Sequence, residues 1–139
     1  MNLSPLTFSL LVASLGFLSS PEAFAADATR VFFNSPKNGA ELSSPVSVSM
    51  GVSGMKVAPA GEVKTGEGHH HLIVDGAPIK EGEIVPSDAT HIHFGKGQVE
   101  TSVPLSPGKH KLTLQFADGA HRSYGEKMSE TIEVQVKDK

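Results

Sequence analysis

The sequence has 139 residues, with 12 basic and 15 acidic side chains, seven histidines and a formal net charge of −3. This balance argues against nucleic acid as a partner and offers no basic patch for a membrane surface. Cysteine is absent, which excludes disulfides, thiolate metal ligands, a catalytic thiol and a lipid anchor on cysteine.

The first 25 residues are typical of a cleavable secretory signal. Residues 6–18 are uncharged and mostly apolar, which suits a signal core and is too short for a membrane-spanning helix. Ala23 and Ala25 flank Phe24 in the small-x-small pattern that signal peptidase recognises. We therefore expect cleavage after Ala25, a periplasmic or secreted protein, and a single mature domain over residues 26–139 without a membrane anchor.

The mature region reads as an all-β domain. Short apolar runs alternate with a period of two between turn-forming residues, and no segment keeps a helical period. Residues 53–68 are rich in glycine and predict a long loop with a short extended piece at Val57. The expected strands cover residues 29–33, 46–52, 69–75, 91–94, 99–103, 112–116 and 132–136. Their spacing predicts an antiparallel β-sandwich of about seven strands, similar to immunoglobulin and fibronectin-type modules.

Two histidine clusters lie on neighbouring expected strands. His69, His70 and His71 begin one strand, and His91 and His93 flank a single residue in the next. Side chains alternate along a strand, so the first and third histidine of the triplet share a face. If the two strands pair, His69, His71, His91 and His93 can supply nitrogen ligands to one metal ion.

Four further residues are candidates for this site. Met55 lies in the loop before the triplet, and its thioether would favour copper, particularly Cu(I), over zinc. His121 follows a turn after the 112–116 strand. His70 is in phase with apolar neighbours, which fits an inward hydrogen-bonded residue as well as a ligand. His110 lies between two lysines, which favours a solvated strand end, although its phase also fits the edge of the core.

Four sequence strings carry a resemblance to a known family. They are GMKVAPAG at 54–61, GHHHLIVDG at 68–76, HIHFGKGQVET at 91–101 and LSPGKHKLTLQFAD at 105–118. With His121, they resemble the bacterial secreted family known as domain of unknown function 4399. The resemblance implies a small exported β-domain in which the histidine strings recur, and it implies no activity. The sequence departs from the family pattern at residues 98–100 and 122–124.

These features favour a periplasmic metal-binding protein that sequesters copper or passes it to a metal-delivery partner, with zinc as the alternative metal. A second hypothesis is an immunoglobulin-like accessory module that binds a protein or glycan without metal. A third is a copper enzyme, because the H-x-H pair followed by Phe-Gly resembles the copper,zinc superoxide dismutases. The cysteine pair of that family is absent here, and the chain has no nucleophile elbow or phosphate-binding loop.

Overall fold

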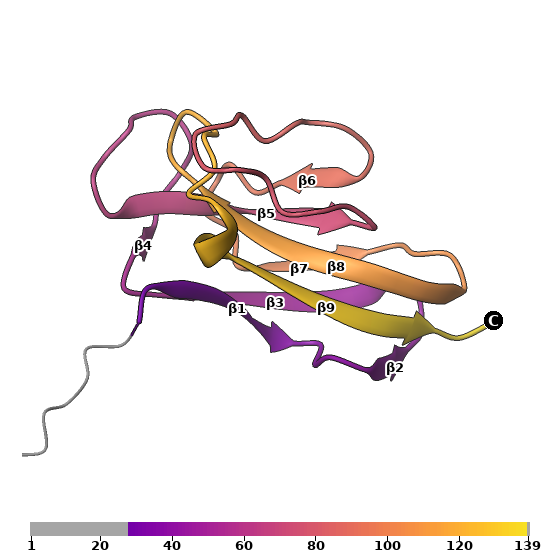
Figure 1. The fold of residues 1–139 in the computed structure, drawn as a ribbon. Helices are drawn as coiled ribbons and strands as arrows, with labels where there is room; N and C mark the ends of the chain where they lie inside the picture. The colour runs from indigo at the N-terminus through magenta and orange to yellow at the C-terminus, as the bar shows by residue number, and fades with distance from the viewer. Residues whose placement is uncertain (1–27, 139) are drawn as a thin grey trace, which may run out of the picture.

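The computed structural model describes residues 28–138, which form two packed β-sheets (Figure 1). The strands are β1 (Arg30–Ser35), β2 (Ala40–Leu42), β3 (Val46–Ser53), β4 (Lys56–Val57), β5 (Glu67–Val74), β6 (His91–His93), β7 (Glu100–Val103), β8 (Gly108–Ala117) and β9 (Ser129–Val136), with a short 3₁₀-helix η1 (Glu126–Met128) before β9. The expected signal segment lies outside the described residues. Within residues 28–138, no helix is long and apolar enough to cross a membrane.

One sheet has the order β1-β3-β7, and the other has the order β2-β9-β8-β5-β4, with β6 also paired to β5. Most pairs are antiparallel, as expected, but β2 runs parallel to β9 and β4 runs parallel to β5. All seven expected strands are present, and the all-β sandwich is confirmed. The two additional strands are β2, which is three residues long and pairs with the distant β9, and β4, which is two residues long, pairs with the next strand and coincides with the expected extended piece at Val57.

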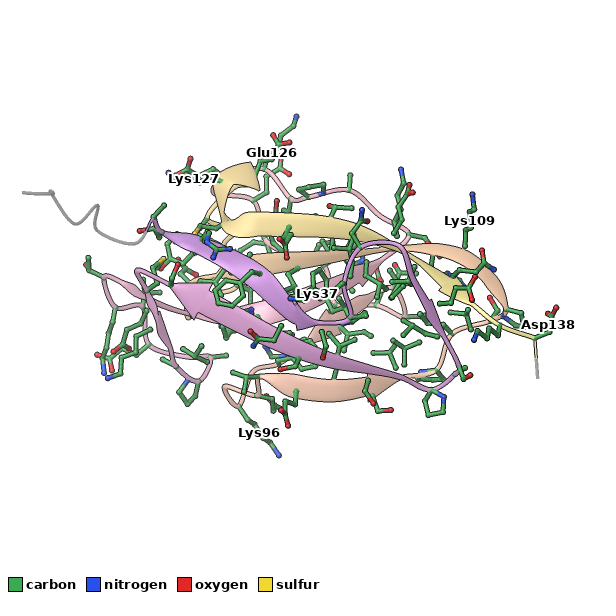
Figure 2. All side chains as sticks on the ribbon, turned by 90° about the horizontal axis from the view of Figure 1, so that it is seen from below. Lys37, Lys96, Lys109, Glu126, Lys127 and Asp138 are labelled. Atoms are coloured by element: carbon green, nitrogen blue, oxygen red, sulfur yellow. The ribbon has the colours of Figure 1, made fainter. Side chains whose placement is uncertain are left out.

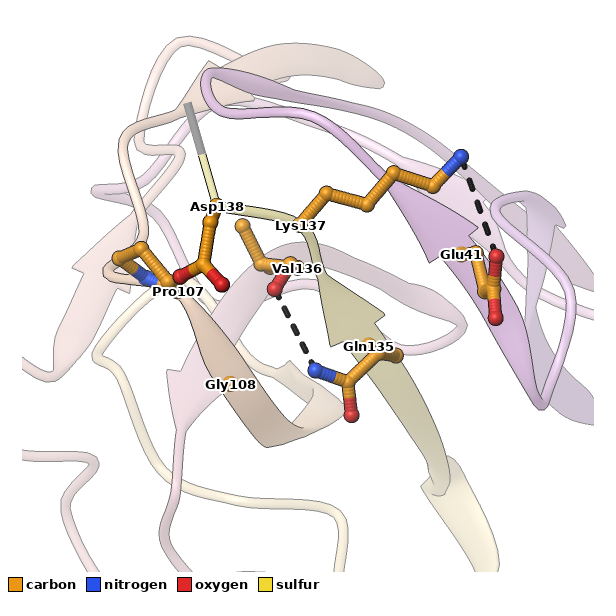
Figure 3. A pocket seen from close by; sticks show the side chains of 7 residues that line it. All are labelled: Glu41, Pro107, Gly108, Gln135, Val136, Lys137 and Asp138. Carbon is orange, nitrogen blue, oxygen red and sulfur yellow. Dashed lines mark hydrogen bonds and ion pairs between the residues drawn. The ribbon is translucent and has the colours of Figure 1, made fainter.

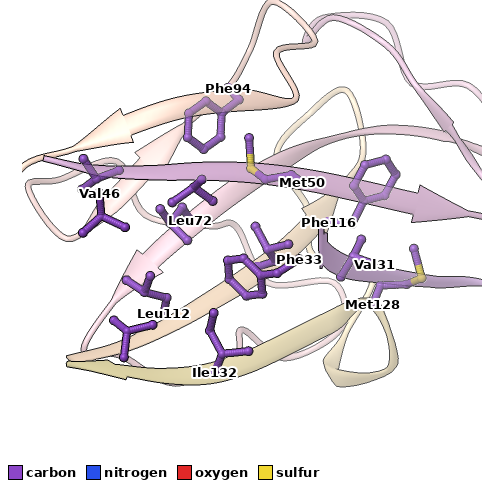
Figure 4. Close-up of a cluster of buried hydrophobic side chains, with 14 of the residues drawn as sticks. Val31, Phe33, Val46, Met50, Leu72, Phe94, Leu112, Phe116, Met128 and Ile132 are labelled. Carbon is purple, nitrogen blue, oxygen red and sulfur yellow. The ribbon is translucent and has the colours of Figure 1, made fainter. Parts of the chain in front are cut away.

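The core lies between the two sheets and follows the alternation seen in the sequence. Figure 4 shows Phe33 and Met50 of the smaller sheet facing Leu72 and Phe116 of the larger one. Lysines project outward from the rim, as Lys96, Lys109 and Lys127 do in Figure 2. The apolar faces are thereby buried against each other, which supplies the main driving force for folding.

Several long connections cover the outer face of the larger sheet near the start of β5 (Figure 1). Gln115 of β8 anchors them, because its amide nitrogen donates to the backbone carbonyls of Gly125 and Met128 at 3.0 and 3.3 Å. Its amide oxygen accepts a hydrogen bond from the backbone N–H of Ile79 at 2.9 Å. Gln115 pairs directly with His71 in the β5–β8 register. The anchored connections therefore cover the outer face of the sheet at the histidine triplet.

Candidate metal centre

The first and third histidines of the triplet lie on the outer face of the larger sheet. Side chains alternate along β5, and Leu72 belongs to the core, so His69 and His71 point away from it. Both are nevertheless buried, with 0% and 1% of their surface exposed. The connections that cover this face exclude water from both rings.

Strand β6 brings a third histidine to this pair. It runs antiparallel to β5, and the register places His93 opposite His71, as the expected pairing of the two strings requires. The ring centre of His93 lies 5.0 Å from that of His69 and 5.1 Å from that of His71. One ring nitrogen from each of the three residues lies within 4.8 Å of the other two. His93 is exposed, so the trio opens to solvent on this side.

A fourth histidine reaches the trio from the loop after β8. The Nε2 atom of His121 lies 3.0 Å from Nε2 of His93. Its ring centre lies 5.0 Å from that of His69 and 5.9 Å from that of His71. We call these four residues the four-histidine cluster. Its members come from β5, β6 and the loop after β8. Histidines from three segments that are far apart in the sequence therefore lie close together in the fold.

The turn that carries His121 is held by Asp118. One carboxylate oxygen of Asp118 accepts hydrogen bonds from the backbone N–H groups of Ala120 and Arg122, at 2.8 and 2.9 Å. The φ angle of His121 is 66°, in the left-handed region that non-glycine residues rarely adopt. The side chain of Asp118 thus stabilises an unfavourable backbone conformation that directs His121 toward the cluster.

The nitrogen contacts within the cluster suit a shared cation. The Nε2 atoms of His69 and His71 lie 3.0 Å apart, the same separation as in the His93–His121 pair. Two nitrogens bound to one ion at about 2.0–2.1 Å would themselves lie roughly 3 Å apart. Two neutral imidazoles that face each other through Nε2 can share only one proton. Each contact is therefore satisfied either by one N–H···N bond or by a cation that accepts both lone pairs.

Burial and mutual repulsion keep these rings neutral. Burial lowers the pKa of His69 from 6.5 to about 4, assisted by the positive charge that His121 and His93 would carry. Burial also lowers the pKa of His71 to about 3, with further lowering from the other histidines. The pKa of His93 is lowered by burial and by His121. At neutral pH these three imidazoles therefore offer lone pairs, which a metal ion requires of its histidine ligands.

The structure places His91 outside the four-histidine cluster. It lies on β6 opposite Ile73, two residues before His93. Its Nδ1 atom is 2.8 Å from a carboxylate oxygen of Asp88, and the pKa of that carboxyl is lowered chiefly by this hydrogen bond. The same oxygen accepts the backbone N–H of Thr90 at 2.9 Å. The Asp88 turn therefore holds the Nδ1 side of His91, and this ring is not part of the close group of ligand atoms formed by His69, His71 and His93.

His70 faces the core, in the direction opposite to its two neighbours. Its ring packs edge-on against Phe116, with the ring centres 5.0 Å apart. Both ring nitrogens are buried without a hydrogen-bond partner among the described residues. Burial lowers the pKa of His70 to about 4, and the nearby His69 lowers it further. Its inward phase agrees with the sequence, but the expected hydrogen bond is not formed.

Met55 packs against the hydrophobic core at the boundary between β3 and β4. This is the usual role of methionine, whose flexible thioether fills gaps between apolar groups. The ligand set that the structure brings together consists of imidazole alone.

His110 lies at the opposite end of the larger sheet, where it closes the edge of the core. Its Nδ1 atom is 2.8 Å from a carboxylate oxygen of Asp75, and its Nε2 atom is 2.8 Å from the backbone carbonyl of Ser106. Burial alone would lower the pKa of His110, but these two contacts raise it. Both contacts are with oxygen acceptors, so they favour the doubly protonated ring, and the Ser106 hydroxyl lies 3.3 Å from the same Nε2 atom.

A shallow pocket also lies at this opposite end (Figure 3). Its wall includes the exposed ion pair between Lys137 and Glu41, with 3.8 Å between nitrogen and oxygen. The amide of Gln135 donates to the carbonyl of Val136 at 3.3 Å. No histidine lines this pocket. The lysine, the glutamate and the Gln135 amide nitrogen are thus already paired, and the pocket offers no comparable ligand set.

The comparisons with known proteins give one match. A family model described as domain of unknown function (DUF4399) matches residues 48–137, which contain every histidine of the chain. No curated protein and no solved structure matches.

Proposed function

The chain belongs to the family described as domain of unknown function (DUF4399), and because that description names no activity, we propose from the site that it binds a transition metal. The ligands are His69, His71 and His93, with His121 as the fourth. The observation that supports this proposal most strongly is that these imidazoles come together in two pairs, each with its Nε2 atoms 3.0 Å apart. Two of the four rings are fully buried, and among residues 28–138 their only polar contacts are with each other.

Copper is the metal that we propose, with zinc as the alternative. An all-nitrogen ligand set without carboxylate or thiolate disfavours magnesium and calcium, which prefer oxygen. Among divalent ions of the first transition row, copper binds such sites most tightly. The Met55 argument for Cu(I) is weakened, because this side chain packs against the core. Imidazole ligands alone support Cu(II) at least as well as Cu(I).

The proposed role is to hold the ion as cargo in the periplasm, by sequestration or delivery to a partner protein. His93 is exposed while His69 and His71 are buried, so a bound ion would have one side open to ligand exchange. A compartment that favours cysteine oxidation also favours histidine ligands over thiolates.

Titration of the tag-free protein with Cu(II), Cu(I) and Zn(II) tests this proposal. We expect one equivalent of copper to bind with a Kd below about 1 µM. The double variant His71→Ala plus His93→Ala should lose that binding. The matched control is His91→Ala plus His110→Ala, which removes the same number of imidazoles outside the four-histidine cluster. Absence of submicromolar binding, or equal loss in the two double variants, would contradict the proposal.

A further inference from the structure

Residues 58–61, which we call the strap, cross from β4 toward the loop after β8. Every backbone N–H group of the strap donates to a carbonyl of another segment, and Pro59 has none to donate. Ala58 donates to Gly68 at 2.8 Å, Ala60 to Gly95 at 2.9 Å and Gly61 to Gly119 at 2.8 Å. The strap thus joins three segments that are distant in the sequence.

Each of the three acceptors is a glycine close to a member of the four-histidine cluster. Gly68 immediately precedes His69, Gly95 follows His93 by two residues, and Gly119 precedes His121 by two residues. One short segment therefore contacts the backbone beside one histidine of β5, one of β6 and one of the loop after β8.

None of the three glycines has room for a side chain. A Cβ at Gly119 would collide with the backbone carbonyl of Glu62, which directly follows the strap. A Cβ at Gly95 would collide with the ring of His93, and one at Gly68 with the carbonyl of Ala117. None of them has a positive φ angle. Space, rather than backbone conformation, accounts for glycine at these positions.

We infer that the strap and its three glycine acceptors are positioning elements of the metal site, and that the seating of the strap sets how tightly and how long the ion is held. This inference rests on the proposed function. Strand pairing places His93 relative to β5, whereas His121 lies in the loop after β8 and belongs to no named strand. Metal ligands must be held to within about half an ångström of their productive geometry. The strap supplies this constraint through backbone hydrogen bonds that a substitution at Gly119 would disturb.

The variant Gly119→Ala tests the inference, because the added methyl group displaces the strap without removing a ligand. We expect copper to dissociate at least tenfold faster than from the wild type, with an altered electron paramagnetic resonance spectrum of Cu(II). The control Gly51→Ala inserts a methyl group against the ring of Phe32 in the other sheet. It should leave both the dissociation rate and the spectrum unchanged. Equal rates in wild type and Gly119→Ala would overturn the inference.

A second measurement requires neither a variant nor copper. Amide hydrogen exchange in the wild type should slow at Ala60 and Gly61 when Zn(II) is added, because a loaded site holds the strap closed. Unchanged exchange at both amides in the loaded protein contradicts the inference.

The metal-free protein separates this inference from the proposed function. There, the imidazole signals of His93 and His121 in nuclear magnetic resonance spectra should shift in Gly119→Ala but not in Gly51→Ala. If the wild type binds no metal, the proposed function is wrong. The shifts in the metal-free protein still test whether the strap positions the rings. Unshifted signals would show that it does not.

Discussion

His93 and His121 have Nε2 atoms 3.0 Å apart although 28 residues separate them in the sequence. The first lies on β6 and the second on the loop after β8, and these segments share no strand pairing with each other. A metal ion bound by both would cross-link them and also attach both to β5 through His69 and His71. Such an ion binds the folded chain and has no equivalent site in the unfolded chain.

Metal loading should therefore raise the thermal stability of the protein. A ligand at 100 times its Kd adds about 2.7 kcal/mol to the free energy of unfolding. For a domain of this size, we expect the melting temperature to rise by roughly 10 °C with excess Zn(II). Differential scanning calorimetry measures this shift, which should disappear in His71→Ala plus His93→Ala. A similar rise in that variant would place the ion elsewhere.

Removal of His121 and removal of His91 should have different effects. His121→Ala deletes a proposed ligand, and we expect copper affinity to fall at least tenfold, comparable with the loss seen when groups around a metal site are removed. His91→Ala deletes a ring bound to Asp88 and should change affinity less than threefold. Competition titration against a chelator of known affinity measures both. An equal fall in the two variants would restore His91 to the ligand set.

The strands could be predicted because apolar and polar residues alternate along them, which indicates the face that is buried. The pairing of the two histidine strings could also be predicted, and β6 places His93 opposite His71. Alternation could not indicate that His91 is engaged by Asp88, because that contact depends on the turn before β6. A pattern of period two assigns faces, but it does not identify the partner of each side chain.

The burial of His69 could not be predicted, since outward residues on a sandwich are expected to be solvated. It depends on loops whose paths are set by distant contacts, such as that between Gly61 and Gly119. The inclusion of His121 in the cluster could not be predicted either, because no periodic pattern indicates where the side chain of a loop residue points. The short strand β2 could not be predicted either, since it exists only through its pairing with β9, whereas β4 coincides with the short extended piece expected at Val57.

His70→Leu should stabilise the protein without affecting the metal site. The imidazole buries two nitrogens without partners, and a buried unpaired polar group costs about 1–3 kcal/mol. Denaturant unfolding at pH 7 should show a gain of that order, with copper affinity unchanged within threefold. A loss of copper binding would instead make His70 a ligand.

The stability gained by His70→Leu should be larger at acidic pH. Burial lowers the pKa of His70 in the folded chain to about 4. Between pH 6.5 and about 4, this residue is therefore protonated in the unfolded chain and neutral in the folded chain. The wild type therefore keeps its full stability above pH 6.5 and loses up to roughly 3 kcal/mol from this residue as the pH falls toward 4. Metal-free His70→Leu should lack this component. Parallel pH profiles for the two proteins would show that His70 is not the group that titrates.

The His110–Asp75 pair should stabilise the fold in a defined pH window. Despite burial, hydrogen bonding raises the pKa of His110 above 6.5 and lowers that of Asp75 below 3.8. The contribution of His110 is thus present below pH 6.5 and lost as the pH rises through its folded pKa, while that of Asp75 is lost in acid. His110→Gln should cost about 1 kcal/mol at pH 5.5 and less at pH 8.5.

Thermal unfolding at the two pH values tests this expectation. The control Lys111→Gln removes a neighbouring positive charge but keeps the backbone N–H of residue 111 that bonds Asp75. It should show no such pH dependence. A cost for His110→Gln that is equal at pH 5.5 and 8.5 would mean that the ring acts only through packing.

Substitution of Asp118 should weaken metal binding through the turn that carries His121. Asp118→Ala removes the acceptor for the backbone N–H groups of Ala120 and Arg122. Without it, the left-handed conformation of His121 loses its support, and we expect copper affinity to fall roughly tenfold and stability by about 1–2 kcal/mol. Asp118→Asn keeps a side-chain oxygen at the same position and should restore most of both losses.

The asparagine variant also separates geometry from charge. The carboxylate of Asp118 raises the pKa of His69 against the larger effect of burial, so its negative charge also favours a cation at that ring. If Asp118 supports copper affinity mainly by holding the turn, Asp118→Asn will bind copper within threefold of the wild type, with an unchanged Cu(II) electron paramagnetic resonance spectrum. If Asp118→Asn binds as weakly as Asp118→Ala, the charge is the main contribution, and the role assigned to the turn is wrong.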